Sequence, residues 1–375
     1  MTRVLHVYKT YGADGWGGVE RCIAQLLRAG AARSDTGEVL TTGFQDSTEQ
    51  LDGVTVHTVR RQVNIASTPM AWQFLSQLQT LATRFDVIHY HFPWPWMDLA
   101  HLLGRVSTPS VVTYHSDVVR QTGWMTLYRP LMHRFLASVN RIIVTSPNYL
   151  ATSPVLARYQ DKCTVIPIGL DPASYPPAAN SKLEHWHARV GEGFFLFVGV
   201  LRYYKGLHLL VEAARRSGLP IVIAGDGPMA TTLHAQSRDI TNIHWLGNVS
   251  EDDKAALLSL CKAFVFPSHL RAEAFGISLL EAAMHGKAMI SAEIGTGTSY
   301  INRHGETGIV IPPENPQALA DAMQTLRNDA QLCSAYGQAA QQRFTQLFQA
   351  ELGADQHAAL YHGVIQANHH AAPAH

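Results

Sequence analysis

Two glutamates, Glu273 and Glu281, stand eight positions apart where an apolar run passes into a helical pattern. The run Phe264 to Pro267 predicts a strand, the polar residues after it predict a loop that carries Glu273, and a helix is expected to begin near Gly276. The first N–H groups of a helix have no intrahelical acceptor and lie at the positive end of its dipole, so they favour an anion such as a diphosphate. The amides concerned belong to Phe275, Gly276, Ile277 and Ser278.

The two carboxylates would reach different parts of one ligand, because one precedes the predicted helix and the other lies inside it. A carboxylate accepts hydrogen bonds from neighbouring hydroxyl groups. We therefore assign Glu273 to a sugar and Glu281 to a ribose. The structural alternative makes Glu281 an ordinary surface residue of the helix and Glu273 a partner of the helix dipole.

A basic segment follows another predicted strand. The stretch from Phe197 to Gly206 reads FVGVLRYYKG and places Arg202 and Lys205 between a strand and a helix. These cations would neutralise a diphosphate, and they would stabilise most strongly the charge that develops as the bond to it breaks. The alternative is a solvated basic turn.

Three smaller motifs end or follow other predicted strands. Gly17 and Gly18 open the first predicted helix, His115 ends an apolar run, and Asn248 and Val249 follow a strand in the second half of the chain. Each motif also has a structural interpretation: a glycine pair forms ordinary loops, a histidine at a strand end is often buried in the fold, and asparagine tolerates turn conformations.

Together these segments resemble glycosyltransferase family 4, the retaining enzymes of the GT-B fold, over nearly the whole chain. The sequence EAFGISLLEAAMHGKAMI resembles the family's Glu-x7-Glu signature, and VGVLRYYKG resembles its Gly-x-Leu-x-x-x-Lys-Gly stretch. This chain has Val200 where many members carry an arginine directly after the first glycine.

The resemblance implies a role for each motif. His115 would hydrogen-bond the donor sugar, with Glu273, Arg202 and Lys205 as the other catalytic residues. The residues implied to bind the donor nucleotide sugar are Gly17, Gly18, Asn248, Val249, Phe275, Gly276, Ile277 and Glu281. The leaving phosphate would itself take the acceptor's proton, and no metal or other cofactor is expected because the two cations and a helix N-terminus would replace it.

The stretch from Glu293 to Asn302, together with VGVLRYYKGL, resembles enzymes of bacterial O-polysaccharide assembly that use GDP-mannose or GDP-rhamnose. By that resemblance we expect an α-mannosyltransferase of lipopolysaccharide O-antigen synthesis, with a GDP-sugar donor and a lipid-linked saccharide acceptor. A GDP-rhamnose or UDP-hexose transferase remains open. An epimerase or phosphorylase on the same architecture, and a scaffold subunit without catalysis, are further alternatives.

Composition and charge limit the classes of partner and the cellular location that we expect for this chain. Lys plus Arg equal Asp plus Glu, at 29 each, so the chain lacks the basic excess that binding to nucleic acid favours. Met1 leads directly into a strand-like run, without the basic and apolar regions of a secretory signal, so we expect a cytoplasmic protein. The segment from Gly123 to Leu136 mixes aromatic, apolar and basic residues and predicts either peripheral membrane contact or a helix packed on the core.

The elements that must position these residues form two similar series. Short apolar runs alternate with helical patterns in both halves of the chain, which predicts parallel sheets covered on both faces. We therefore expect an α/β GT-B fold, with an acceptor domain at 1–172 and a donor domain at 173–346. A terminal helix at about 347–367 is expected to pack on the first domain, and the ligands are expected to bind between the domains.

Overall fold

The computed structural model describes residues 1–12, 17–33, 35–65, 68–117 and 122–371, with the side chains of 122–127 and 371 excepted. The chain forms two compact units, one of residues 1–169 and 350–375 and the other of residues 170–349. The boundaries therefore fall within a few residues of the domain limits expected from the sequence. Each unit is described by itself.

The first unit is built on an eight-stranded sheet in the order β10-β9-β8-β7-β1-β2-β4-β3. All pairs in it are parallel except β3 with β4. A separate hairpin consists of β5 and β6. The strands are β1 (Arg3–Val7), β2 (Thr36–Gly43), β3 (Ser47–Leu51), β4 (Val54–Arg60), β5 (Val63–Ile65), β6 (Thr68–Met70), β7 (Val87–Phe92), β8 (Ser110–Tyr114), β9 (Arg141–Val144) and β10 (Cys163–Val165).

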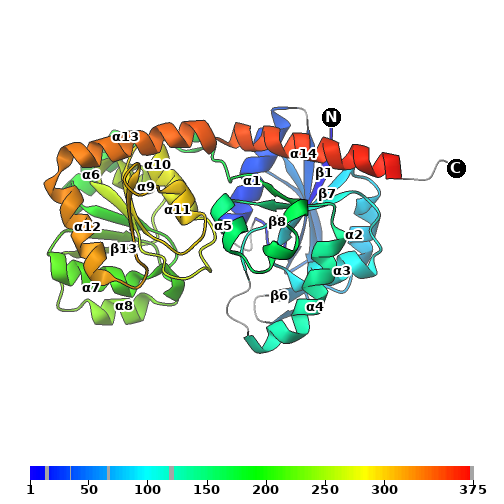
Figure 1. The fold of residues 1–375 in the computed structure, drawn as a ribbon, viewed down its shortest axis with the longest axis horizontal. Helices are drawn as coiled ribbons and strands as arrows, with labels where there is room; N and C mark the ends of the chain where they lie inside the picture. The colour runs from blue at the N-terminus through cyan, green and yellow to red at the C-terminus, as the bar shows by residue number, and fades with distance from the viewer. Residues whose placement is uncertain (13–16, 34, 66–67, 118–121, 372–375) are drawn as a thin grey trace. The chain divides into compact units, whose positions relative to one another are not determined.

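Helices cover both faces of this sheet. In Figure 1, α1 and α14 lie on one side of the strands and α2, α3 and α4 on the other. A core cluster joins strand residues Val4, Val87 and Val111 to Tyr361 and Val364 of α14. The helices are α1 (Gly18–Ala31), α2 (Phe74–Ala82), α3 (Pro95–Leu103), α4 (Thr122–Ser138), α5 (Pro147–Thr152) and α14 (Ala350–Ala371).

The second unit has a six-stranded parallel sheet in the order β13-β12-β11-β14-β15-β16. Its strands are β11 (Phe195–Val198), β12 (Ile221–Ala224), β13 (Ile243–Gly247), β14 (Ala263–Phe266), β15 (Ala288–Ala292) and β16 (Gly308–Ile311). Within this unit α7 and α8 lie on one side of the sheet and α9 and α10 on the other (Figure 1). Its helices are α6 (Asn180–Val190), α7 (Leu207–Ser217), α8 (Ala230–Gln236), α9 (Glu251–Leu260), α10 (Ile277–Met284), α11 (Thr298–Ile301), α12 (Pro316–Asn328) and α13 (Ala330–Leu347).

Both sheets confirm the predicted class of two Rossmann-like α/β folds. The apolar runs of the sequence become the buried central strands, such as β8 and β14, because residues on both faces of a covered parallel sheet are apolar. Among the described helices, none is both long enough and apolar enough to cross a membrane. The segment Gly123 to Leu136, for which the sequence predicted membrane contact or core packing, lies within α4. The side chains of residues 123–127 are not among those that the structure describes.

Candidate functional site

The loop after β11 brings Lys205 against Glu273. The Lys205 ammonium forms an ion pair with Oε2 of Glu273, which also accepts a hydrogen bond from Ser268 Oγ at 3.2 Å. Both charged side chains are largely buried, at 12% and 11% exposed. The Lys205 Nζ also lies 4.6 Å from the centre of the Phe266 ring, which attracts a cation through its face. The pair therefore sits at the end of β14, in the segment that the sequence singled out.

Tyr204 places Arg202 in the same group. Burial raises the pKa of the Tyr204 phenol, the negative charge of Glu273 raises it further, and the charges of Lys205 and Arg202 oppose that rise. Arg202 itself is exposed. Tyr204 is therefore within electrostatic range of Glu273, Lys205 and Arg202, and the exposed Arg202 can be reached by an anion from solvent.

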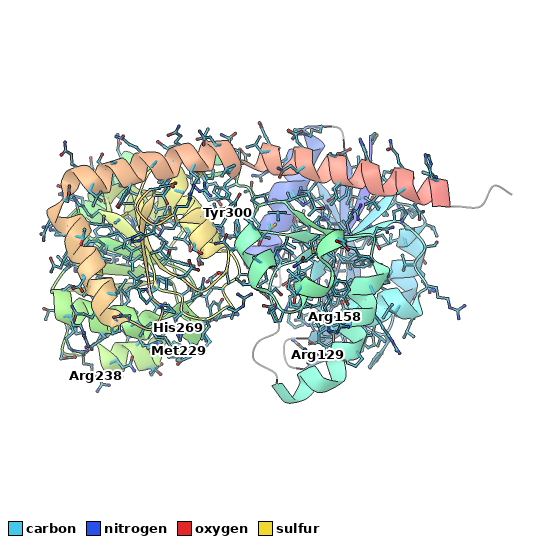
Figure 2. All side chains as sticks on the ribbon, viewed as in Figure 1. Arg129, Arg158, Met229, Arg238, His269 and Tyr300 are labelled. Carbon is cyan, nitrogen blue, oxygen red and sulfur yellow. The ribbon has the colours of Figure 1, made fainter. Side chains whose placement is uncertain are left out.

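Gly206 and His269 hold this loop in place. Gly206 has φ +71°, and a Cβ there would come 2.1 Å from the carbonyl oxygen of Pro267, so only glycine permits this approach. His269, labelled in Figure 2, donates its backbone N–H to the Tyr204 carbonyl at 3.0 Å, and its ring Nε2 donates to the Tyr203 carbonyl at 3.0 Å. Its Nδ1 lies 3.1 Å from Oε1 of Glu314. These contacts fix the backbone on both sides of Lys205.

The N-terminus of α10 begins where the sequence predicted it. Gly276 is the residue before the helix and has φ +98°, and Ile277 is the first helical residue. The first amides of α10 therefore have no acceptor within the helix. The Phe275 side chain is buried and packs against Phe348, so only the Phe275 backbone, not its ring, is available to a ligand.

Replacing Gly276 by alanine is expected to weaken nucleotide binding by at least about tenfold and to cost about 1–2 kcal/mol of folding free energy. The physical reason is that φ +98° is strained for alanine and that its Cβ would lie 3.1 Å from the Phe266 ring. The measurements are GDP binding by calorimetry and urea unfolding. Gly218→Ala is the control, because Gly218 has φ +65° with nothing within 4 Å of a Cβ. It should lose stability but bind GDP normally, and equal binding by both variants would contradict this role for Gly276.

Glu281 lies within α10 and is paired with a lysine that the sequence analysis did not identify. Its Oε1 is 2.7 Å from the Nζ of Lys254, on α9, and the same Nζ is 2.6 Å from Oε2 of Glu251. Glu281 is 4% exposed and Lys254 6% exposed, so Glu281 is no ordinary surface residue. A carboxylate has about four acceptor positions, so Glu281 can accept from a diol while it also contacts the Lys254 ammonium.

The loop between β13 and α9 carries Asn248 and Val249, which the resemblance implies to bind the donor. Gly247 has φ +67° and accepts the Gly225 N–H at 2.7 Å. Asn248 is exposed and Val249 half-buried, and Ser250 then caps α9 by accepting the Asp253 N–H. Because α9 also carries Lys254, this short loop is tied to the Glu281 pair through one helix.

In the first unit, Gly17 and Gly18 are exposed at the start of α1. The buried carboxylate of Glu20 fixes this start: Oε2 accepts the Gly17 N–H at 3.1 Å, and Oε1 accepts the Thr10 hydroxyl at 2.6 Å. A carboxylate in the first turn also suits the helix dipole. Residues 13–16, which precede the glycine pair, lie outside the described part of the chain.

His115 follows β8 and is buried, at 8% exposed. Its backbone N–H donates to the Phe92 carbonyl at 3.1 Å, and its ring Nε2 lies 2.9 Å from Nδ1 of His91 on β7. Burial lowers the pKa of His115 to about 3. The ring is therefore neutral at neutral pH and carries one N–H, which suits hydrogen bonding to a sugar rather than charge stabilisation.

Three buried histidines of this unit raise the question of a metal. Nitrogens of His6, His89 and His91 lie within 4.8 Å of one another. The His89 and His91 rings are stacked, with centroids 4.4 Å apart at 21°, so their in-plane lone pairs cannot meet at one ion. His89 also uses both nitrogens, at 2.6 Å from Thr113 Oγ1 and 2.7 Å from the Tyr361 hydroxyl. This geometry favours a hydrogen-bonded row over a metal centre.

The predicted residues thus fall into two groups. The second unit brings together Lys205 and Glu273, with Arg202 beside them, and places Gly276, Glu281 and the Asn248 loop around α9 and α10. His115, Gly17 and Gly18 belong to the first unit, and a site between the units stays a prediction. Sequence reasoning missed Lys254, His269, Glu20 as an anchor, and His91. The sequence of α9, EDDKAALLSL, gave no signal for Lys254, because this lysine directly follows three acidic residues.

Comparisons with known proteins agree with the motifs. The family model described as Glycosyltransferase Family 4 matches residues 16–174, and the model described as Glycosyl transferases group 1 matches residues 181–343. The D-rhamnosyltransferase WbpZ of Pseudomonas aeruginosa is 51% identical over 352 residues, which cover 93% of this chain and 92% of that protein. The O-antigen chain mannosyltransferase C of Escherichia coli is 44% identical over 369 residues, which cover 97% and 99%.

Solved structures show the same fold. The sucrose-phosphate synthase of Thermosynechococcus elongatus superposes with a TM-score of 0.79 at 20% identity, covering 98% of this chain and 100% of that one. The Anabaena protein HepE, solved with UDP-glucose, gives a TM-score of 0.78 at 19% identity, covering 97% and 100%. The chain therefore belongs to glycosyltransferase family 4 and is a glycosyltransferase with the GT-B fold.

Proposed function

We propose that this enzyme transfers a hexose from a GDP-sugar to a lipid-linked saccharide during assembly of a bacterial O-antigen. The first candidate for the hexose is mannose, and the transfer retains the anomeric configuration. The observation that carries the proposal is the full-length similarity to two transferases, one named for D-rhamnose and one for O-antigen mannose. The P. aeruginosa protein shares the higher identity, at 51%, so GDP-rhamnose is the second candidate donor. A UDP-hexose is the third.

The pairing of Lys205 with Glu273 supports a leaving-group role for the lysine. A cation held in place by a carboxylate needs little reorganisation when charge develops on the departing diphosphate. The amides of Gly276 and Ile277 supply further positive potential at the start of α10. Fixed charges of this kind can do the work of a metal ion, so we propose that transfer needs no metal.

Glu273 and Glu281 would divide the donor between them. Glu281 would accept the ribose hydroxyls while its carboxylate is held by Lys254, and Glu273 would accept a sugar hydroxyl while holding Lys205. No residue is needed as a covalent nucleophile if the leaving phosphate takes the proton of the incoming hydroxyl on the same face. The protein then contributes position and charge.

We further propose that the enzyme works in the cytoplasm at the inner face of the membrane, where a lipid-linked acceptor would be reached. The basic and aromatic composition of the segment Gly123 to Leu136 supports this placement. Sedimentation with anionic liposomes at low salt tests it. Absence of the protein from the pellet at every ionic strength would contradict it.

Calorimetry with GDP, UDP, ADP and dTDP tests the donor base, in buffer containing EDTA. We expect GDP to bind at least about tenfold more tightly than the others, a difference of about 1.4 kcal/mol, without any need for metal. Tighter binding of UDP would overturn the guanine assignment, and binding that returns only with added Mg²⁺ or Mn²⁺ would overturn metal independence.

A further inference from the structure

A row of buried histidines leads from the interior of the first unit to His115. His6 Nδ1 lies 3.1 Å from His91 Nε2, and His91 Nδ1 lies 2.9 Å from His115 Nε2. The rings are nearly parallel, at 24° for His6 with His91 and 19° for His91 with His115. His6 and His91 are 2% and 0% exposed. Two N–H···N hydrogen bonds therefore connect three strands, β1, β7 and the end of β8.

All three rings are neutral. Burial lowers the pKa of His6 and His115 to about 3 and that of His91 well below its usual value. Each neutral ring carries a single N–H. If His91 donates from Nδ1 to His115, the proton of His115 must be on its own Nδ1. If His91 donates from Nε2 to His6, then His115 donates from Nε2 and its Nδ1 is an acceptor.

The state of His91 therefore decides what His115 can offer to a ligand. Among the described residues, Nδ1 of His115 has no hydrogen-bond partner. We propose that His91 is a positioning residue for the transfer reaction, which holds the His115 ring and sets whether its Nδ1 donates or accepts a hydrogen bond. The inference rests on the proposed contact of His115 with the donor sugar.

The surroundings argue against mere packing. Val4, Val87 and Val111 occupy the same face of β1, β7 and β8 two or four residues earlier in each strand and form part of an apolar cluster. An apolar side chain would fill this interior without the cost of burying polar nitrogens. On this face, histidines stand in place of apolar side chains toward the carboxyl ends of the strands, where His115 lies.

Three variants separate positioning from packing. His91→Phe keeps a ring of similar volume and removes both nitrogens, and His91→Asn returns a polar amide close to the position of Nδ1. Tyr361→Phe is the matched control, because it removes the hydroxyl that bonds His89, the adjacent ring of the stack, and leaves the two N–H···N bonds untouched. The readouts are the imidazole ¹⁵N spectrum of His115, assigned by its loss in His115→Ala, and the kcat and donor KM for GDP-mannose.

In the wild type we expect one protonated and one unprotonated nitrogen signal for His115. In His91→Phe the two nitrogen signals of His115 should move toward each other, because both tautomers become populated. The kcat should fall about tenfold, which corresponds to the loss of one hydrogen bond, while the donor KM stays within about twofold of the wild type. His91→Asn should recover most of kcat, and Tyr361→Phe should match the wild type in both readouts.

Unchanged His115 signals in His91→Phe, or equal loss of kcat in His91→Phe and His91→Asn, would overturn the inference. If His91→Phe does not fold, His91→Leu takes its place, because it also lacks both ring nitrogens and unchanged His115 signals in it would overturn the inference. The ¹⁵N spectrum needs no substrate. A protein that turns over no GDP-sugar but shows the expected spectral change would therefore refute the proposed function and not the role of His91 in setting the tautomer of His115.

Discussion

Lys205→Ala is expected to lower the transfer rate by about 10²–10³-fold, the usual effect of removing one preorganised group that stabilises developing charge. The loss should fall mainly on kcat, because the ammonium interacts more strongly with the departing diphosphate than with the bound donor. It should be accompanied by weaker GDP binding, since GDP carries the same phosphates. The measurement is GDP release from GDP-mannose under steady-state conditions.

Two further variants make this result specific. Arg238→Ala removes an exposed cation of the same unit, at the end of α8 (Figure 2), and should leave the rate unchanged. Glu273→Gln keeps the shape of the partner but removes the charge that fixes Lys205, and should also slow transfer. A Lys205→Ala enzyme that retains more than about half of the wild-type kcat would contradict the leaving-group role that preorganised cations commonly have.

Lys254→Met is expected to cost about 3–5 kcal/mol of folding free energy, because it leaves the buried carboxylate of Glu281 without its ammonium partner. The double variant Lys254→Met/Glu281→Gln should recover a large part of this loss, since no unpaired buried charge then remains. Urea unfolding at neutral pH measures both. Additive losses in the double variant would mean that the two side chains are not coupled.

The same variants report on the donor site. Lys254→Met should weaken GDP binding, because the Glu281 carboxylate would lose the ammonium that holds it in place for the ribose. Glu251→Gln removes the more exposed partner of Lys254 and is the control, which should bind GDP as the wild type does. Equal loss of GDP binding in both variants would contradict the assignment of Glu281 to the ribose.

The sequence predicted the central strands well because both faces of a covered parallel strand are apolar. The apolar runs at Ser110–Tyr114 and Gly308–Ile311 in the sequence coincide with β8 and β16. Strand β2 was missed because it reads TGEVLTTG, with a glycine near each end and only two apolar residues. Strand β3 reads STEQL and is mostly exposed, so it has no apolar pattern to detect.

The candidate site divides in a similar way. Glu273, Lys205 and Gly276 could be proposed from the sequence because each lies beside a strand end within a motif of fixed spacing. Lys254 and His91 were not found, because each acts through a partner distant in sequence: Glu281 is 27 residues from Lys254, and His115 is 24 residues from His91. Such pairs depend on strand order and on which helices pack together. A single sequence without homologues holds no direct record of either.

The anomeric form of the first sugar released from GDP-α-mannose tests the central claim most directly. Glycosyltransferases that use water in place of an acceptor leave a free sugar, which proton NMR can resolve before it mutarotates, and no identified acceptor is needed. We predict release of α-mannose with GDP in the presence of EDTA. This release should be faster than release of glucose from UDP-glucose and should be lost in Lys205→Ala. First appearance of β-mannose, or no release of GDP from GDP-mannose or GDP-rhamnose, would contradict a retaining GDP-hexose transferase.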